Sequence, residues 1–202
     1  MIHCSKSLKK TLPQAIENAR ILGNEVEVWA EDEHRIGLKP VLRKVLAPQG
    51  QRPIVEVNPR YQWLWLVAFV EPMTGRNIWF LVPYLTIAVF QVLIDAFALE
   101  LKIRDGKKIL LVVDQATWHT SKKLIVPKGI EFVFLPSHSP ELQPAEHLWA
   151  LSDEVVFNKT FTDLDQLERV LSDQCENLEA NTAVVRSATL FYWWEKLFIQ
   201  IK

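Results

Sequence analysis

The chain has 202 residues, of which 49% are apolar and eight are tryptophan, and its formal net charge is −1. This length and apolar content are sufficient for one globular domain and exclude disorder as the main state, while the near-zero charge argues weakly against a nucleic-acid partner. The two cysteines, Cys4 and Cys175, are far apart and form no CxxC or Cys/His ligand spacing. They therefore favour a reducing, cytosolic setting over a disulfide or zinc scaffold.

The charge is unevenly distributed along the chain. Residues 1–140 carry 18 Lys and Arg against 13 Asp and Glu, whereas residues 141–202 carry 5 against 11. This asymmetry permits a basic face on the first part of the chain, although ordinary solvated surface charge would produce it equally well.

The first elements are expected to be a short helix and a strand. Residues 13–22 form a helical pattern that ends at Gly23, and "EVEVWAED" (25–32) alternates apolar and acidic residues before it stops at Asp32. Residues 61–70 and 76–82 then flank "EPMTGR", a turn sequence that predicts a hairpin between two strands.

The apolar stretch 78–99 could be mistaken for a membrane span. Pro83 interrupts it, and from Ile87 the apolar positions recur every three to four residues. A buried strand followed by a core helix over 86–101, with Thr86 as N-cap, is therefore the better prediction, and no membrane is expected as a partner.

The second half of the chain predicts a central strand and then mostly helices. "KILLVVDQ" (108–115) is an almost continuous apolar run, which is typical of a strand buried on both faces. A short helix around Ser121, a strand over 130–136, and helices at about 144–156, 163–178 and 181–200 are expected to follow. Together these elements predict an α/β fold in which a mixed central sheet of about five strands is flanked by helices, with the first and fourth strands as parallel neighbours.

Three acidic residues lie at the ends of these predicted elements. Asp32 closes the first predicted strand, Asp114 closes the buried strand, and Glu146 lies in the first turn of the next helix. If the two strands are neighbours, both aspartates emerge at one edge of the sheet, and the helix can bring Glu146 to them. Three carboxylates without a basic partner repel one another, and a divalent cation with oxygen ligands, Mg²⁺ or Mn²⁺, would relieve that repulsion.

The blocks that contain these acids also resemble a known family. "EVEVWAEDEHRIGL", "LLVVDQATWHTSK" and "FVFLPSHSPELQPAEHLW" resemble the three signature blocks of the DDE transposases, in particular those of the mariner-like bacterial insertion sequences. The third block is the most specific, and the similarity covers most of residues 8–160, including the lead-in "LKKTLP".

The resemblance implies a function and a set of catalytic residues. It implies a ribonuclease-H-like catalytic domain in which Asp32, Asp114 and Glu146 bind the metal, with two Mg²⁺ or Mn²⁺ ions expected. Such enzymes hydrolyse a phosphodiester at the transposon end, and the freed 3′-hydroxyl then attacks target DNA without a covalent protein intermediate. A homodimer acting on DNA in the bacterial cytoplasm, associated with the nucleoid when DNA is bound, is the corresponding expectation.

The resemblance also suggests how the chain is organised. Residues 1–160 would form the catalytic domain, and residues 161–202 would be a helical extension of the same domain. The helix-turn-helix modules that normally precede this domain are not expected in the 31 residues before Asp32. A fragment, a second reading frame that supplies those modules, and a decayed copy are all compatible with the sequence.

Several further residues have open roles. Glu31 and Glu33 compete with Asp32 as candidates, but on an alternating strand both point to the opposite face. His119 is expected either to contact DNA or to orient the metal site, with a structural role as an equal alternative. The remaining candidates for DNA contacts are the basic residues Arg35, Arg43, Lys122 and Lys123. Trp149 is expected to anchor its helix, and Gln143 keeps a polar amide where relatives often have Asn.

Three other functions are weighed against the transposase. A ribonuclease-H-like nuclease would cleave without joining DNA strands, and a catalytically silent remnant would act only as a dimerising or DNA-binding module. The presence of all three acids argues against the silent remnant. A glycosidase that uses two of the acids is conceivable, but nothing else in the sequence indicates a sugar cleft.

Overall fold

The computed structural model describes residues 5–50, 54, 60–137 and 139–199. These residues form one five-stranded sheet with the strand order β3-β2-β1-β4-β5. The strands are β1 (Glu25–Gly37), β2 (Trp63–Glu71), β3 (Arg76–Val82), β4 (Lys107–Val113) and β5 (Ile130–Phe134). The predicted hairpin is confirmed as β2 and β3, and the predicted parallel neighbours are confirmed as β1 and β4.

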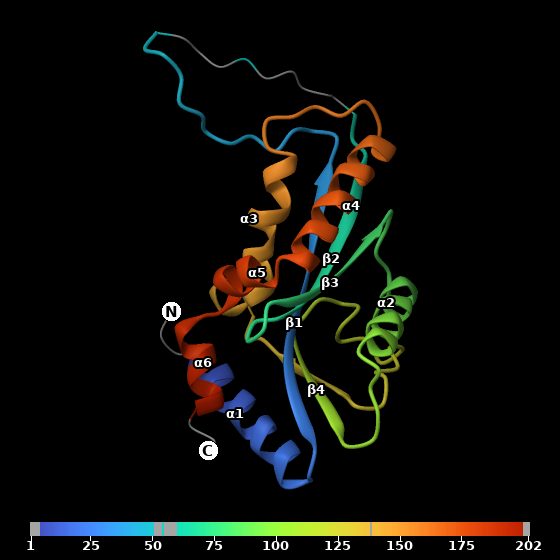
Figure 1. The fold of residues 1–202 in the computed structure, drawn as a ribbon. Coiled ribbons are helices and arrows are strands. Elements are labelled where there is room, and N and C mark those ends of the chain that lie inside the picture. The colour runs from blue at the N-terminus through green and yellow to red at the C-terminus, as the bar shows by residue number, and fades with distance from the viewer. Residues whose placement is uncertain (1–4, 51–53, 55–59, 138, 200–202) are drawn as a thin grey trace.

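Strand β1 changes its partners along its length. Its first half is parallel to β4, from the pair Glu25↔Lys107 to the pair Ala30↔Val112. Its second half is antiparallel to β2, from Ala30↔Val70 to Gly37↔Trp63. Figure 1 shows β1 running beside β4 at one end and beside β2 at the other. The sheet therefore opens between β1 and β4 just beyond Ala30.

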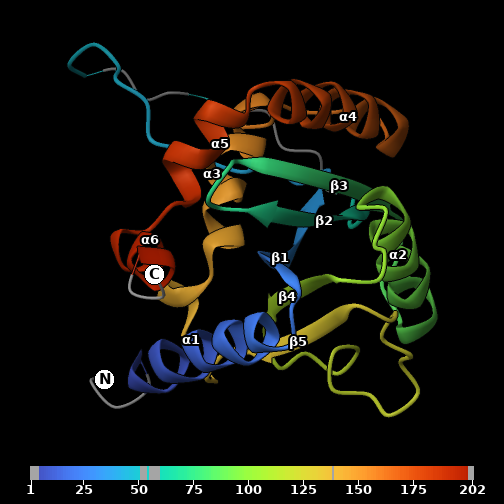
Figure 2. The same ribbon diagram turned by 60° about the horizontal axis from the view of Figure 1, so that its bottom comes forward.

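Helices cover both faces of this sheet, as Figure 2 shows. On one face α2 (Ile87–Glu100) packs Phe90, Ile94 and Phe97 against the apolar side chains of β1, β2 and β4. The other face is covered by α1 (Ser5–Ile21), α3 (Leu148–Ser152), α4 (Leu164–Ala180), α5 (Thr182–Thr189) and α6 (Tyr192–Ile199). The C-terminal helices contribute Leu171 and Trp194 to the same hydrophobic cluster as α1 and the strands.

The apolar stretch 78–99 is a strand and a helix, as predicted. Strand β3 ends at Val82, and α2 begins at Ile87 behind the N-cap Thr86, whose hydroxyl oxygen accepts a hydrogen bond from the backbone nitrogen of Val89 at 3.2 Å. Across the described residues, no helix combines the length and the apolar character that crossing a membrane requires.

Three expectations about the elements were wrong. Strand β1 does not stop at Asp32 but continues to Gly37, because β2 pairs with this polar half of the strand, including Asp32↔Ala68. Around Ser121 there is no helix among the described residues; the bond from Thr120 N to Ala116 O at 3.1 Å is a single turn that does not continue. The helix expected at about 181–200 is two helices, because the chain bends after Thr189 and places Trp194 in the core.

Two boundaries also differ from the prediction. Helix α1 begins at Ser5 and contains Pro13, and its buried side chains Leu8, Leu12 and Ile16 lie four residues apart on one face. The helical stretch predicted at about 144–156 consists of the 3₁₀ turn Pro144–His147, the short helix α3 and the 3₁₀ turn Asp153–Val155.

Candidate active site

A cavity of about 420 Å³ lies where β1 and β4 separate, and the three predicted carboxylates all line it. Its lining residues are Asp32, Asp114, Gln115, Ala116, Leu135, Pro136, Ser137, Ser139, Pro140, Gln143 and Glu146. None of these lining residues is basic. The structure thus brings side chains that are 82 and 32 residues apart in sequence to one cavity.

Each acid reaches the cavity from a different element. Asp32 lies in β1, two residues beyond the last pair with β4. Asp114 is the first residue after β4, and Glu146 lies in the 3₁₀ turn that begins at Pro144. Because proline is favoured at the first position of a helical turn, Pro144 helps to define where the Glu146 segment starts.

Asp32 is held by a tryptophan from the segment that follows Glu146. The indole Nε1 of Trp149 donates a hydrogen bond to Oδ2 of Asp32 at 2.9 Å. The pKa of Asp32 is raised to about 7, by burial first and then by the charges of Glu33 and Glu146, with the Trp149 hydrogen bond acting in the opposite direction. In this environment the ionised form of the carboxyl group is unfavourable in free energy unless a cation lies near it.

Asp114 and Glu146 differ in their electrostatic surroundings. Oδ1 of Asp114 accepts hydrogen bonds from the backbone nitrogen of Ala116 at 2.8 Å and from His119 Nδ1 at 2.9 Å, and the His119 bond lowers the pKa of Asp114. Burial raises the pKa of Glu146; His147 opposes this shift, whereas the charge of Asp114 supports it. The negative charge of Asp114 therefore disfavours ionisation of Glu146 across the cavity.

The donor set fits a hard divalent cation. Three carboxylates from separate elements face a cavity whose described lining contains no Lys, Arg or His; His119, outside the lining, contacts Asp114. Oxygen ligands with space for water are the ligands that Mg²⁺ prefers in proteins. Asp32, Asp114 and Glu146 could therefore hold such an ion.

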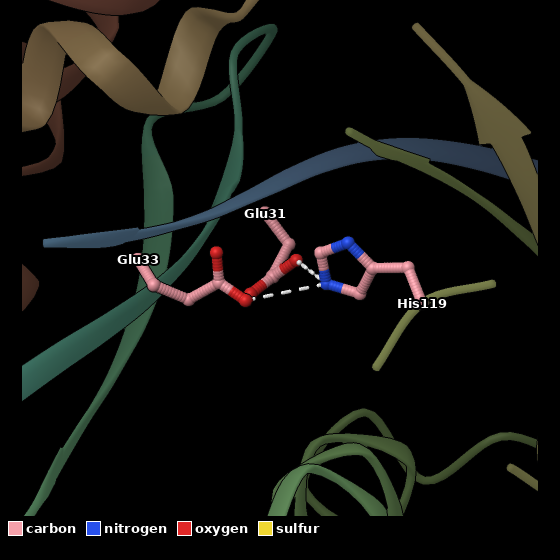
Figure 3. Close-up of side chains that lie close together, drawn as sticks. All are labelled: Glu31, Glu33 and His119. Carbon is pink, nitrogen blue, oxygen red and sulfur yellow. Dashed lines mark ion pairs between the residues drawn. The ribbon is translucent and has the colours of Figure 1, made fainter. Parts of the chain in front are cut away.

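A second group of ionisable residues lies on the opposite face of β1 from Asp32. Glu31, Glu33 and His119 place one ligand atom each within 4.8 Å of one another, and Figure 3 shows both glutamates directed toward the imidazole. His119 Nε2 lies 3.0 Å from Glu31 Oε2 and 3.3 Å from Glu33 Oε1. Among the described residues this is the one group gathered so tightly; the predicted triad borders one cavity at wider spacing.

The expectation that His119 contacts DNA does not agree with the structure, because its side chain has no exposed surface. The alternative expectation, that it orients the metal site, stays a prediction; Nδ1 of His119 forms a hydrogen bond with Oδ1 of Asp114 at 2.9 Å. The other basic candidates are exposed. The guanidinium of Arg35 lies 5.0 Å from the ring centre of Trp63, and that of Arg43 lies 4.8 Å from the ring centre of Phe157.

Two contacts at the site were not predicted from the sequence. Gln143 is buried, and its Nε2 donates to the backbone oxygen of Glu31 at 2.8 Å, so it joins the Glu146 segment to β1. The bond from Trp149 to Asp32 makes the same connection six residues after Gln143. The only sequence signals for these contacts are a polar amide and a tryptophan that flank Glu146 at short spacing.

Comparison with known proteins places this site in a family context. A family model described as DDE superfamily endonuclease matches residues 27–168, a range that contains all three acids. The uncharacterized protein y4pE/y4sA of Sinorhizobium fredii (strain NBRC 101917 / NGR234) is 33% identical over 106 residues, which are 52% of this chain and 77% of that protein.

Solved structures of a transposase share the fold. The chain aligns with the Mos1 strand transfer complex (18% identity, TM-score 0.59) over 97% of its own length and 60% of that chain. It aligns with a pre-cleavage Mos1 transpososome (15% identity, TM-score 0.62) over 97% of its own length and 61% of the length of that chain. The chain therefore spans about 60% of these proteins. The likeness confirms the expected ribonuclease-H-like α/β fold.

Proposed function

Because the chain belongs to the DDE superfamily endonucleases, we propose that it is the catalytic domain of a transposase. It cleaves DNA at transposon ends and joins the freed 3′ end to target DNA. The observation that carries this proposal is the cavity in which Asp32, Asp114 and Glu146 meet without a basic residue in the described lining.

In this proposal the three acids hold two divalent cations. When bound, two such ions stabilise the attacking and leaving oxygens of an in-line phosphoryl displacement. The raised pKa values of Asp32 and Glu146 support a cation site, since a cation would offset the burial and repulsion that disfavour their charges. The solved structures of the Mos1 paired-end complex with Mn and with Mg support the choice of metal.

The surrounding residues hold the carboxylates in place. The hydrogen bond from Trp149 orients Asp32, and the backbone nitrogen of Ala116 orients Asp114. Gln143 fixes the Glu146 segment to β1. Two of these contacts join the Glu146 segment to β1, and the third fixes the Asp114 carboxylate locally. Hydrogen bonds of this kind orient the ligands of a metal site.

The DNA contacts and the assembly are also proposals. The exposed basic side chains of Arg35, Arg43, Lys122 and Lys123 would meet phosphates, which dominate the affinity of proteins for DNA. A homodimer that acts on DNA ends in the cytoplasm is also proposed; the Mos1 paired-end complex with a transposon end supports DNA ends as the substrate. Residues 161–202 are proposed to be part of the catalytic domain, which the burial of Leu171, Val185 and Trp194 in the shared core supports.

The experiment compares Asp114→Asn with Asp105→Asn in a DNA assay. Asp105 is an exposed aspartate paired with Lys128, so its variant controls for loss of one surface carboxylate. Wild type and Asp105→Asn should cut and join a plasmid that carries the DNA flanking this gene, in the presence of Mg²⁺ or Mn²⁺, whereas Asp114→Asn should do neither.

The products separate the alternatives. Nicked DNA without joined products would indicate a nuclease that lacks strand transfer, and no cleavage by the wild type would indicate a silent remnant. Cleavage by Asp114→Asn at the wild-type rate would contradict the assignment of the triad.

A further inference from the structure

The backbone does not fix the distance between Asp32 and Asp114. The ladder between β1 and β4 ends at the pair Ala30↔Val112, and each aspartate lies two residues beyond it. Beyond Ala30, β1 pairs only with β2, so the sheet separates where the two carboxylates must be held at a defined spacing. A metal site with ligands on both strands therefore requires a contact that spans this gap.

The imidazole of His119 spans it. Its Nδ1 lies 2.9 Å from Oδ1 of Asp114, which follows β4. Its Nε2 lies 3.0 Å from Glu31 Oε2 and 3.3 Å from Glu33 Oε1, and these glutamates flank Asp32 in β1 (Figure 3). One ring thus connects the end of one strand to the middle of the other.

The ring is also fixed in orientation. Its side chain has no exposed surface, and the ring of Phe90 from α2 is T-shaped to it, with ring centres 4.7 Å apart. The ring of Phe132 from β5 lies 6.2 Å away on centres, and the indole of the adjacent Trp118 donates to Glu33. These aromatic rings pack against the imidazole, and a rotation of the ring would move Nδ1 away from Asp114.

We propose that His119 is a positioning residue that braces Asp114 against β1 through Glu31 and Glu33 and so sets the spacing of the two aspartates. The inference rests on the proposed function, since the spacing matters because the aspartates bind metal. Buried partners that orient metal ligands typically change metal affinity about 10–100-fold when they are removed.

Two other roles compete with the brace. His119 could merely fill space between α2 and the sheet. Alternatively, the buried group of Glu31, Glu33 and His119 could itself hold a metal, because neither oxygen of Glu31 has a hydrogen bond of good geometry to a described residue. The brace is favoured because Nδ1 forms a hydrogen bond with Asp114 at 2.9 Å, while Nε2 lies within ion-pair distance of both glutamates, a charge contact without hydrogen-bond geometry.

The test uses His119→Asn and His119→Gln, with Mn²⁺ binding measured by calorimetry in the absence of DNA. An Asn amide can replace Nδ1 and keep the bond to Asp114, whereas a Gln amide replaces Nε2 and loses it. The brace predicts that Mn²⁺ affinity falls about 10-fold or more in His119→Gln and by less in His119→Asn. A space-filling role predicts the opposite order, because Gln is closer to histidine in volume.

Crystal structures of the metal-free variants provide a readout that does not depend on metal binding. The Asp114 carboxylate should keep its place in His119→Asn and leave it in His119→Gln. If it keeps its place in His119→Gln, the brace is overturned, whatever the metal affinity. If the wild type binds no Mn²⁺ while Asp114 moves as expected, the brace stands and the proposed function fails.

Two more variants complete the design. Glu31→Gln keeps the shape of the buried group, so it tests the brace if the His119 variants do not fold; it should weaken Mn²⁺ binding and displace His119. Lys128→Gln changes an exposed lysine paired with Asp105 and should leave both readouts unchanged. Mn²⁺ bound between Glu31, Glu33 and His119 in wild-type crystals would overturn the brace in favour of a metal site there.

Discussion

The indole nitrogen of Trp149 donates a hydrogen bond to the carboxylate of Asp32 at 2.9 Å, although the two residues are 117 positions apart. The bond connects β1 to the helix that follows Glu146, so the same side chain that packs this helix also orients a proposed metal ligand. Trp149 is in turn stacked on His34, with ring centres 5.0 Å apart. Packing and ligand orientation are therefore coupled at this residue.

Trp149→Phe separates those two contributions. Phenylalanine keeps an aromatic ring against His34 but removes the donor to Asp32, so we expect Mn²⁺ affinity to fall by about 10-fold. We expect the free energy of unfolding to fall by about 1–2 kcal/mol. Calorimetry and chemical denaturation measure the two quantities.

Trp63→Phe is the matched control, because Trp63 is partly exposed on β2 and has no contact with the triad in the described structure. It should leave Mn²⁺ affinity unchanged. Unaltered affinity in Trp149→Phe would show that the hydrogen bond does not orient Asp32.

Metal affinity should depend on pH because of Asp32. Its pKa is raised to about 7, mainly by burial and then by the charge of Glu33. Below that pH the carboxyl group is protonated and must lose its proton to bind a cation, so apparent affinity should rise about tenfold per pH unit up to pH 7 and then level off. Titrations with Mn²⁺ between pH 5.5 and about 8.5 measure this profile.

Glu33→Gln tests whether the charge of Glu33 contributes to the raised pKa of Asp32. Removing the charge of Glu33 should lower the pKa of Asp32, so Mn²⁺ affinity should level off at a lower pH than in the wild type. A flat profile in the wild type would contradict the raised pKa.

In the metal-free protein, the raised pKa of Asp32 should lower the free energy of unfolding at neutral pH. Because the folded-state pKa of Asp32 is above its unfolded value of about 3.9, the folded protein binds the proton more tightly, and stability from this group is lost as pH rises from about 4 through 7. Asp32→Asn removes the ionising group, so with a chelator present its Tm at pH 8 should exceed that of the wild type by about 2 °C or more.

The difference should shrink toward pH 4, where Asp32 is protonated in the folded wild-type protein. A Tm of Asp32→Asn below that of the wild type at pH 8 would argue that the carboxylate is stabilised by partners other than a metal.

Gly75→Ala tests whether α5 is a fixed part of the catalytic domain. Gly75 has φ of +79°, and a Cβ there would lie 1.9 Å from the backbone oxygen of Thr182 and 2.8 Å from the backbone nitrogen of Arg186. The methyl group would push α5 away from the β2–β3 turn, so we expect a loss of about 2–4 kcal/mol in the free energy of unfolding.

The control is Gly50→Ala, at which φ is +86° and a Cβ would meet nothing within 4 Å. It measures only the effect of placing alanine at a positive φ, a loss of about 1 kcal/mol in the free energy of unfolding. Equal effects of the two substitutions would show that α5 does not pack on the turn as described.

The sequence predicts those features that depend on local pattern. The alternation in residues 25–32 placed Asp32 on one face of β1 and both neighbouring glutamates on the other, and the structure agrees. The apolar run before Asp114 predicted a strand buried at the centre of the sheet. Thr86 predicted the start of α2 because the side chain and the helical period both indicate it.

Features that depend on long-range contacts could not be predicted in this way. Polar residues after Asp32 suggested a strand end, but pairing with β2 extends the strand to Gly37. Glu31 was expected only to point to the face opposite Asp32; it is fully buried there, with His119, 88 positions away, against it. The break after Thr189 is set by the burial of Trp194, which no local period reveals.

The most direct test of the account is a crystal structure of the protein soaked in Mn²⁺, with anomalous scattering used to locate the ions. The account predicts metal density in the cavity between the carboxylates of Asp32, Asp114 and Glu146. Absence of density there, in crystals whose cavity is open to solvent, would contradict the claim that these three side chains form a metal-dependent catalytic site.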